Sequence, residues 1–281
     1  MSSRQNDALV TDSSRVIPQL AHGWAGCATG PVTVVLHGGG PGCHAASDFS
    51  AVMSRRPDRR WLWVDLPGYG GSEPVVAAST PRLIVAAQAL DGLLERLELE
   101  DVDVLAQSLG GTVALRLAAL RPERLRRIVV IGSQPVPAPV DAVGVHIDPG
   151  LGVRARIKYY GGIGPTQDKM RALISELEWY KTNSVPESTV RARYLASISP
   201  IALVKPTVSS AVEEPSVDLG AVSAPTLVVW GRHDPFADPR YAAVLADALP
   251  RGDLAVLGRT AHHPQAERPE AVAALTEAFF H

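Results

Sequence analysis

Short apolar runs, rich in β-branched residues, recur along the chain, and each one ends at a glycine, a proline or a polar residue. The runs cover residues 32–36, 61–65, 102–106, 128–131, 226–230 and 254–257. Apolar residues follow one another in these runs, without a regular alternation of apolar and polar positions. Such runs are typical of parallel strands that are buried on both faces of a sheet. We therefore predict a mostly parallel β-sheet formed by these segments.

Helical patterns separate the strand-like runs. Between residues 83 and 97, leucine and alanine follow the spacing i, i+3, i+4, i+7, with Pro81 near the first turn. Residues 112–120 are rich in alanine and leucine, and Pro122 stops the pattern. This alternation of strands and helices predicts a doubly wound α/β fold.

The alternation is interrupted between about residues 135 and 224. This stretch contains prolines and glycines and then two helical segments. The first segment carries an apolar stripe, formed by Met170, Leu173, Ile174 and Leu177. We predict that residues 135–224 form a helical lid, inserted between the sixth and seventh strands. The α/β core would then consist of residues 1–134 and 225–281, with residues 1–14 frayed.

Composition narrows the classes of protein. With 281 residues, 46% of them hydrophobic, the chain is long enough for one α/β domain with an insertion. The net charge of −2 at pH 7 argues against nucleic acid or an acidic membrane as a partner. No apolar run reaches the length of a membrane span, and Cys27 and Cys43 fit neither a disulfide framework nor a zinc motif. We therefore predict a cytoplasmic protein that acts on a small molecule.

Ser108 lies in the segment A-Q-S-L-G-G at 106–111, between a strand-like run and a helix. A serine hydroxyl is a weak nucleophile, and a sharp strand–turn–helix corner presents it clear of the backbone, beside a base. Ala106 stands where the usual pattern has its first glycine. On its own, Ser108 could equally be a helix N-cap. Together with the motifs below, it is predicted to be a nucleophile.

An acid and two histidines follow the serine along the chain. Asp234 comes directly after the strand-like run 226–230, which places its carboxylate at the carboxyl edge of the sheet, where the sites of open α/β sheets lie. An acid at that position can orient a catalytic imidazole. His262 and His263 both follow the last strand-like run, so either could be the base. His233 adjoins the acid and is predicted to be a solvent-facing turn residue.

The glycine-rich segment H-G-G-G-P-G at 37–42 follows the first strand-like run. Glycines there would let the backbone N–H of Gly38 or Gly39 point at a developing oxyanion, with the N–H of Leu109 opposite. Loss of one such donor typically costs about 3 kcal/mol in barrier height. A phosphate site is disfavoured, because the segment matches neither G-x-x-x-x-G-K-[ST] nor G-x-G-x-x-G. The eight histidines show no metal-ligand spacing, so we predict neither a metal nor a cofactor.

Taken together, these motifs resemble those of the α/β-hydrolase superfamily over nearly the whole chain. Within it, the glycine run, the serine corner and the helical lid are most similar to the meta-cleavage-product hydrolases, which cleave a carbon–carbon bond in 2-hydroxy-6-oxo-dienoates. The resemblance implies that His262 is the base, because Pro264, Glu267 and Pro269 then fall in their expected places.

The resemblance also implies three substrate contacts. Gln107 stands in place of an asparagine of that group. Arg193, in V-R-A-R-Y-L-A at 190–196, falls where those enzymes have a lid arginine that binds the substrate carboxylate. His263 stands where the group usually has tryptophan, and is expected to line the pocket.

The sequence thus predicts a serine-dependent hydrolase, compatible with a homo-oligomer, that cleaves a carbon–carbon bond beside a ketone in a small acidic substrate. Several alternatives stay open. They are a carboxylesterase or lactonase, a hydrolase like the proline iminopeptidases, and a non-hydrolytic member such as a ligand receptor or a cyclising enzyme of secondary metabolism. An intact triad argues against a pure binding role, although function belongs to the site and not to the fold.

Overall fold

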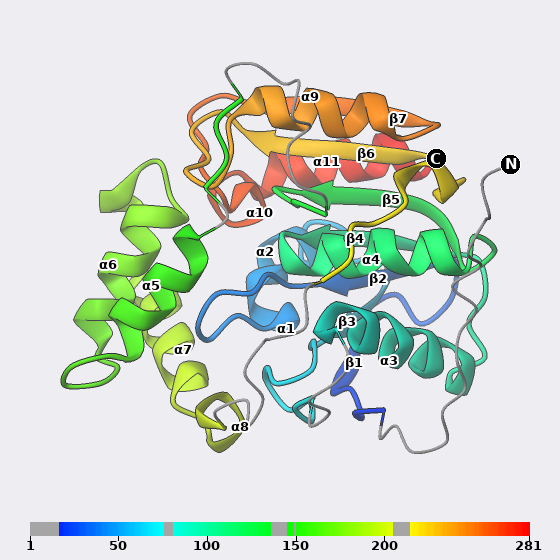
Figure 1. Cartoon of the computed structure of the whole chain (residues 1–281). Helices are drawn as coiled ribbons and strands as arrows, with labels where there is room; N and C mark the ends of the chain where they lie inside the picture. The colour runs from blue at the N-terminus through cyan, green and yellow to red at the C-terminus, as the bar shows by residue number, and fades with distance from the viewer. Residues whose placement is uncertain (1–16, 76–80, 136–144, 149, 205–213) are drawn as a thin grey trace, which may run out of the picture.

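The computed structural model describes residues 17–75, 81–135, 145–148, 150–204 and 214–281 (Figure 1). A seven-stranded sheet forms the centre of this described part, with the strand order β1-β3-β2-β4-β5-β6-β7. The strands are β1 (His22–Gly26), β2 (Val32–Leu36), β3 (Arg60–Val64), β4 (Val102–Gln107), β5 (Leu125–Ile131), β6 (Thr226–Gly231) and β7 (Gly252–Leu257). Neighbouring strands are parallel, except that β1 pairs antiparallel with β3. The prediction of a mostly parallel sheet is confirmed.

Strand β1 was not among the predicted strands. Its sequence, H-G-W-A-G, has no apolar run, and its residues alternate between exposed and half-buried. It pairs only with β3, at one edge of the sheet, in a register that joins His22 to Val64 and Gly26 to Arg60. An edge strand of this kind is held by its ladder of backbone hydrogen bonds more than by burial, so hydrophobic patterning does not reveal it.

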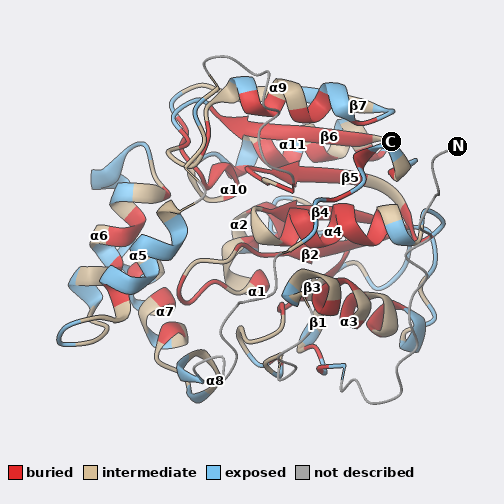
Figure 2. Cartoon of the chain, in the orientation of Figure 1, coloured by how far each residue is buried: buried red, intermediate tan, exposed pale blue. Residues whose placement is uncertain are grey.

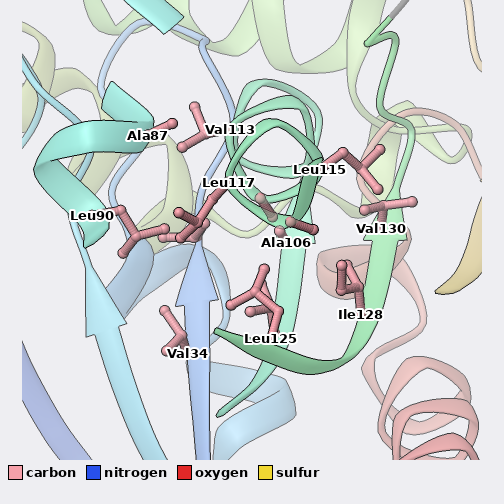
Figure 3. Close-up of a cluster of buried hydrophobic side chains, with 14 of the residues drawn as sticks. Val34, Ala87, Leu90, Ala106, Val113, Leu115, Leu117, Leu125, Ile128 and Val130 are labelled. Atoms are coloured by element: carbon pink, nitrogen blue, oxygen red, sulfur yellow. The ribbon is translucent and has the colours of Figure 1, made fainter. Parts of the chain in front are cut away.

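Helices cover both faces of the sheet (Figures 1 and 2). The core helices are α1 (Ala45–Asp48), α2 (Ser50–Met53), α3 (Arg82–Arg96), α4 (Leu109–Leu120), α9 (Pro239–Ala248), α10 (Pro264–Glu267) and α11 (Pro269–Phe280). The buried side chains of α3, α4 and α9 pack on one face, and those of α2 and α11 on the other. Figure 3 shows the first of these cores, where Leu90 of α3 and Val113 of α4 approach strand residues such as Val34. Successive residues of β4 serve opposite faces, with Val104 in the first core and Leu105 in the second.

The helical insert lies between β5 and β6, and not between a sixth and a seventh strand as predicted. Its helices are α5 (Leu151–Tyr160), α6 (Gln167–Leu177), α7 (Glu187–Ser197) and α8 (Pro200–Leu203), with single turns at Thr182–Ser184 and Leu219–Ala221. In Figure 1 these four helices gather beyond the end of the sheet toward which β5 and β6 point. The predicted stripe of α6 is buried at Met170, Leu173 and Ile174, in a small core of its own with Tyr159 and Val190. Within the ranges that the structure describes, no helix has the length and apolar character needed to cross a bilayer.

Candidate active site

The corner between β4 and α4 holds Ser108 in an unusual backbone conformation. Its φ of 48° and ψ of −113° lie in a region that non-glycine residues rarely adopt, at a cost of about 1–3 kcal/mol. Two backbone hydrogen bonds hold the corner in place. The Ser108 N–H donates to the Ile131 carbonyl at 2.7 Å, and the Gly110 N–H donates to the His37 carbonyl at 3.1 Å. The strand–turn–helix corner predicted from the sequence is therefore present and strained.

Gly110 and Gly111 allow α4 to start this close to the sheet. A Cβ atom on Gly110 would lie 2.6 Å from the His37 carbonyl oxygen and 2.7 Å from the Leu36 side chain. A Cβ atom on Gly111 would lie 1.9 Å from the Ser133 hydroxyl. Any larger residue would push the helix away and displace Ser108, which explains why the motif ends in two glycines.

His262 contacts Asp234 behind Ser108. The Nδ1 of His262 lies 2.7 Å from Oδ2 of Asp234, and the other carboxylate oxygen accepts the Phe236 N–H at 2.9 Å. Both side chains are buried. With Nδ1 donating to the carboxylate, Nε2 is left as the acceptor, which is the tautomer that a general base requires. Ser108 and His262 line the same cavity.

The two other histidines considered from the sequence have other partners, although His263 lines the same cavity, as expected. His263 points toward Glu178, with 3.4 Å between its Nδ1 and Oε2 of the glutamate. Burial lowers the pKa of His263 to about 3, so its imidazole is neutral at neutral pH. His233 is exposed and stacks on Tyr180 at 4.3 Å. Asp234 thus contacts His262 rather than His263.

The glycine loop after β2 is held by two side chains that anchor its carbonyl groups. The Leu66 N–H donates to Nε2 of His37 at 2.9 Å, so Nδ1 carries the proton and donates to the Gly38 carbonyl at 2.7 Å. The Tyr69 hydroxyl donates to the Gly39 carbonyl at 2.8 Å. In a trans peptide the C=O and the N–H point in opposite directions, so fixing the Gly38 oxygen turns the Gly39 N–H away from His37. His37 is thus a positioning residue for this loop.

Gly39 and Leu109 lie next to each other in the cavity wall. A Cβ atom on Gly39 would lie 3.2 Å from the Leu109 side chain, and both residues line the cavity with Ser108. Among the residues that the structure describes, neither backbone N–H has an acceptor. Gly38 lies behind them, where a Cβ atom would meet Oε1 of Gln107 at 1.9 Å. Of the two glycines predicted as donors, Gly39 therefore has the suitable position.

Acid should destabilise the fold through His37. Burial lowers the pKa of this imidazole to about 3, whereas an exposed histidine titrates near 6.5, so between these values only the unfolded chain binds the proton. The stability that His37 contributes is complete above pH 6.5 and is lost as the pH falls toward 3. His37→Gln should therefore reduce the pH dependence of the unfolding free energy by about 1.4 kcal/mol per pH unit between pH 4 and 5.5. Urea unfolding at several pH values measures this, and an unchanged slope would show that His37 is not buried as a neutral group.

A cavity of about 420 Å³ connects the core residues to the insert. Its floor carries Gly39, Ser108, Leu109 and His262, and Leu173 and Leu177 of α6 contribute to its wall. This volume, and a wall that combines apolar with polar and charged side chains, suit a site for a small polar organic molecule.

Gln107, predicted as a substrate contact, lines this cavity and is fully buried. Its Nε2 donates to the His262 carbonyl at 3.1 Å, which ties the serine strand to the histidine loop. Its Oε1 has no hydrogen-bond partner among the described residues. A buried acceptor without a partner is rare, and this oxygen packs against Gly38.

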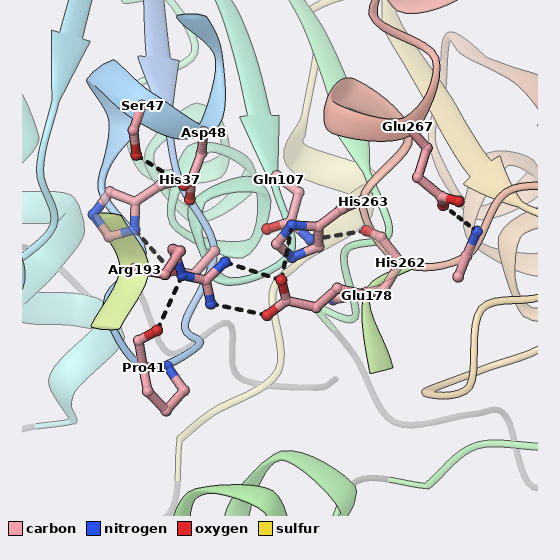
Figure 4. Close-up of polar contacts among 12 residues, drawn as sticks. His37, Pro41, Ser47, Asp48, Gln107, Glu178, Arg193, His262, His263 and Glu267 are labelled. Atoms are coloured by element: carbon pink, nitrogen blue, oxygen red, sulfur yellow. Dashed lines mark hydrogen bonds and ion pairs between the residues drawn. The ribbon is translucent and has the colours of Figure 1, made fainter. Parts of the chain in front are cut away.

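Arg193 has a different environment from the predicted one. Its Nη1 and Nη2 donate to the two carboxylate oxygens of Glu178 at 2.9 and 2.8 Å, and its Nε donates to the Pro41 carbonyl at 3.0 Å (Figure 4). The side chain is 3% exposed and does not line the cavity, whereas Glu178 does. This geometry argues against a direct contact with a substrate carboxylate, because the guanidinium already holds one.

Glu178 is the residue that the sequence did not suggest. It lies one residue after α6. Burial raises the pKa of its carboxyl, but the Arg193 guanidinium outweighs burial and lowers that pKa to about 2, so Glu178 is ionised. The third glycine of the loop makes room for this pair, since a Cβ atom on Gly40 would lie 2.9 Å from Nη2 of Arg193. The ion pair joins the insert to the glycine loop, because Arg193 also donates to the Pro41 carbonyl. The insert is joined to the histidine loop as well, because the His263 N–H donates to the Glu178 carbonyl at 3.1 Å.

A family model described as "alpha/beta hydrolase fold" matches residues 32–269, most of the chain. The chain belongs to the α/β-hydrolase family. It is a hydrolase of this fold, homologous to the serine hydrolases of meta-cleavage products. The resemblance to the meta-cleavage-product hydrolases is thus confirmed as homology, and the α/β-hydrolase family is confirmed.

The relatives include three enzymes named for such substrates. The 2-hydroxymuconate semialdehyde hydrolase of Pseudomonas sp. (strain CF600) is 31% identical over 260 residues, 88% of this chain and 85% of that protein. The structure of a 2-hydroxy-6-oxo-6-phenylhexa-2,4-dienoate hydrolase from Rhodococcus sp. strain RHA1 matches with a TM-score of 0.73 and 25% identity, over 92% of this chain and 93% of the other. A meta-cleavage product hydrolase from Pseudomonas fluorescens IP01 matches with a TM-score of 0.75 and 22% identity, over 93% of both chains, which shows the shared fold.

Proposed function

We propose that this protein is a serine hydrolase that uses Ser108, His262 and Asp234 to cleave a carbon–carbon bond beside a ketone in a small acidic substrate. The observation that supports it best is the common cavity. Its floor holds a strained serine, a histidine bonded to a buried carboxylate, and two backbone N–H groups for which the described residues offer no acceptor. The choice of a carbon–carbon bond rests on the relatives, whose names specify 2-hydroxymuconate semialdehyde and 2-hydroxy-6-oxo-dienoates.

In the first step, the Ser108 oxygen attacks the ketone carbon and its proton passes to Nε2 of His262. The carbonyl oxygen becomes an oxyanion and accepts hydrogen bonds from the Gly39 and Leu109 N–H groups. Asp234, bonded to Nδ1 at 2.7 Å, stabilises the imidazolium that forms. The anchors on the Gly38 and Gly39 carbonyls keep the loop from reorganising as charge develops.

In the second step, the carbon–carbon bond breaks and its electron pair goes to the departing carbon, which takes the proton from His262. The departing carbon needs an electron sink, and a carbonyl group conjugated with it in the substrate supplies one. Water then attacks the acyl group left on Ser108, again with His262 as the base, and releases a carboxylic acid. The overall reaction consumes one water and requires no cofactor.

We further propose that the insert of residues 135–224 acts as the lid of this site, with Gln107 and His263 as substrate contacts. The support is that Leu173, Leu177 and Glu178 line the cavity together with the core residues. A cavity closed by the insert would exclude water from the carbonyl until the leaving group has gone.

A carboxylesterase or lactonase is the second candidate, favoured by one observation. Glu178 neutralises Arg193 beside the cavity, so that part of the wall offers no free cation to a substrate carboxylate. A neutral ester would suit such a wall as well as a keto acid does.

Three substrates distinguish the candidates when they are offered to the purified protein. They are 2-hydroxy-6-oxo-6-phenylhexa-2,4-dienoate, a nitrophenyl ester and an aminoacyl anilide. We expect the dienoate to be cleaved with a kcat/KM at least tenfold above that of the ester, and the anilide to be inert. If the ester is preferred and the dienoate survives, the esterase function replaces the one proposed.

A further inference from the structure

Among the described residues, four charged side chains line the catalytic cavity, and they divide into two kinds. The two acids, Asp148 and Glu178, are each paired with an arginine outside the cavity wall, Arg154 and Arg193 respectively. The two bases, Arg82 and Arg156, have no carboxylate partner in the described part of the chain. Since the charge of each acid is matched by its own arginine, the positive charges of Arg82 and Arg156 are left unmatched at the cavity.

Both arginines act near Tyr69, the side chain that anchors the glycine loop. Burial raises the pKa of the Tyr69 hydroxyl, and the charges of Arg156 and Arg82 oppose that rise, which places both within electrostatic range of it. The same hydroxyl lies 2.8 Å from the Gly39 carbonyl oxygen, close to the proposed oxyanion donors. A short acid whose carbonyl carbon reaches Ser108 could therefore also reach these guanidinium groups.

The two arginines come from different parts of the fold. Arg82 is the first residue of α3 in the core, and Arg156 lies in α5 of the insert, with its guanidinium carbon 5.3 Å from the centre of the Tyr160 ring. Both are exposed toward the solvent while they line the cavity. Arg156 contacts the Tyr160 ring and the Tyr69 hydroxyl, but within the described part of the chain no carboxylate has to give up either arginine before it binds an anion. Arg193, by contrast, would have to leave the buried Glu178 carboxylate without its guanidinium partner, which is strongly unfavourable.

We propose that Arg82 and Arg156 form the subsite that binds the carboxylate of the substrate, and that Arg193 does not. This inference rests on the proposed function, since it assigns a binding site to the carboxylate of the proposed keto-acid substrate. Each guanidinium can hold a carboxylate oxygen by a charge-assisted hydrogen bond. An acid bound between α3 and α5 also joins the core to the insert.

The test measures binding without turnover, in a Ser108→Ala background. The probes are 6-oxo-6-phenylhexanoate, a saturated keto acid, and its methyl ester, and their affinities are measured by calorimetry. Arg82→Gln and Arg156→Gln should each weaken binding of the acid at least fivefold and leave binding of the ester within twofold. Lys158→Gln is the matched control, because it removes a positive charge from the same helix at a residue that pairs with Glu176 and does not line this cavity.

Two results would overturn the proposal. One is equal weakening of acid and ester by Arg82→Gln and Arg156→Gln. The other is loss of acid binding in Arg193→Gln while the other two variants bind normally, which would place the carboxylate at Arg193. Because turnover plays no part, a wild-type protein that cleaves no ketone substrate would contradict the proposed function and leave this subsite standing.

Discussion

Ser108→Ala should fold as the wild type does and lose about four to six orders of magnitude in kcat, because the members of a triad act as a unit. The corner that holds Ser108 depends on backbone hydrogen bonds to Ile131 and His37, which alanine retains, so the melting temperature should change little. Steady-state kinetics on the dienoate, with circular dichroism on the same samples, measures both quantities.

Ser133→Ala provides the matched control. Ser133 is a buried serine that follows the neighbouring strand, packs near Gly111 and does not line the cavity. Its loss should leave kcat/KM within a few-fold of the wild type. Activity of Ser108→Ala within tenfold of the wild type would show that another group is the nucleophile.

His262→Ala should abolish turnover to a similar degree, whereas His263→Ala should mainly alter KM. Of the two histidines, His262 contacts Asp234, at 2.7 Å. His263 instead contacts Glu178 at 3.4 Å, and its imidazole is neutral and lies at the cavity wall. Asp234→Asn should cost about four orders of magnitude in kcat, because an amide would favour the wrong tautomer of the imidazole.

The kinetics of both histidine variants must be compared on one substrate, under conditions in which each is folded. A large loss of kcat in His263→Ala, with His262→Ala active, would reverse the assignment of the base. Equal and small losses in both would instead point to a reaction that needs no base at this position.

The sequence predicted most of the sheet, and it suggested the groups that we propose as catalytic, because both depend on local patterns. The runs that became β2, β4 and β6 are apolar because these parallel strands are buried along their whole length inside the sheet. The serine corner is also local, because Gly110 and Gly111 reveal the close approach of helix and strand. The edge strand β1 depends on tertiary pairing, which such patterns do not record. The insert lies between the predicted runs 128–131 and 226–230, so its place along the chain was predicted and only the numbers of its flanking strands were wrong.

The environment of Arg193 is the clearest case of a feature that the sequence pattern does not reveal. Its partner Glu178 lies 15 residues earlier, after another helix, and its third contact, Pro41, lies 152 residues away. Nothing in the segment E-L-E-W-Y marks the second glutamate as a buried counter-ion. Arg82 and Arg156 likewise become cavity residues only when α3 and α5 are brought to the same opening.

Covalent labelling tests the central claim most directly. A fluorophosphonate that reacts with activated serines is incubated with the wild type, Ser108→Ala and His262→Ala, and the modified peptide is located by mass spectrometry. The proposed triad predicts one adduct per chain, on the peptide that contains Ser108, with slow labelling in His262→Ala and none in Ser108→Ala. An adduct at another serine, or unchanged labelling of Ser108→Ala, would contradict the assignment of Ser108 as the nucleophile.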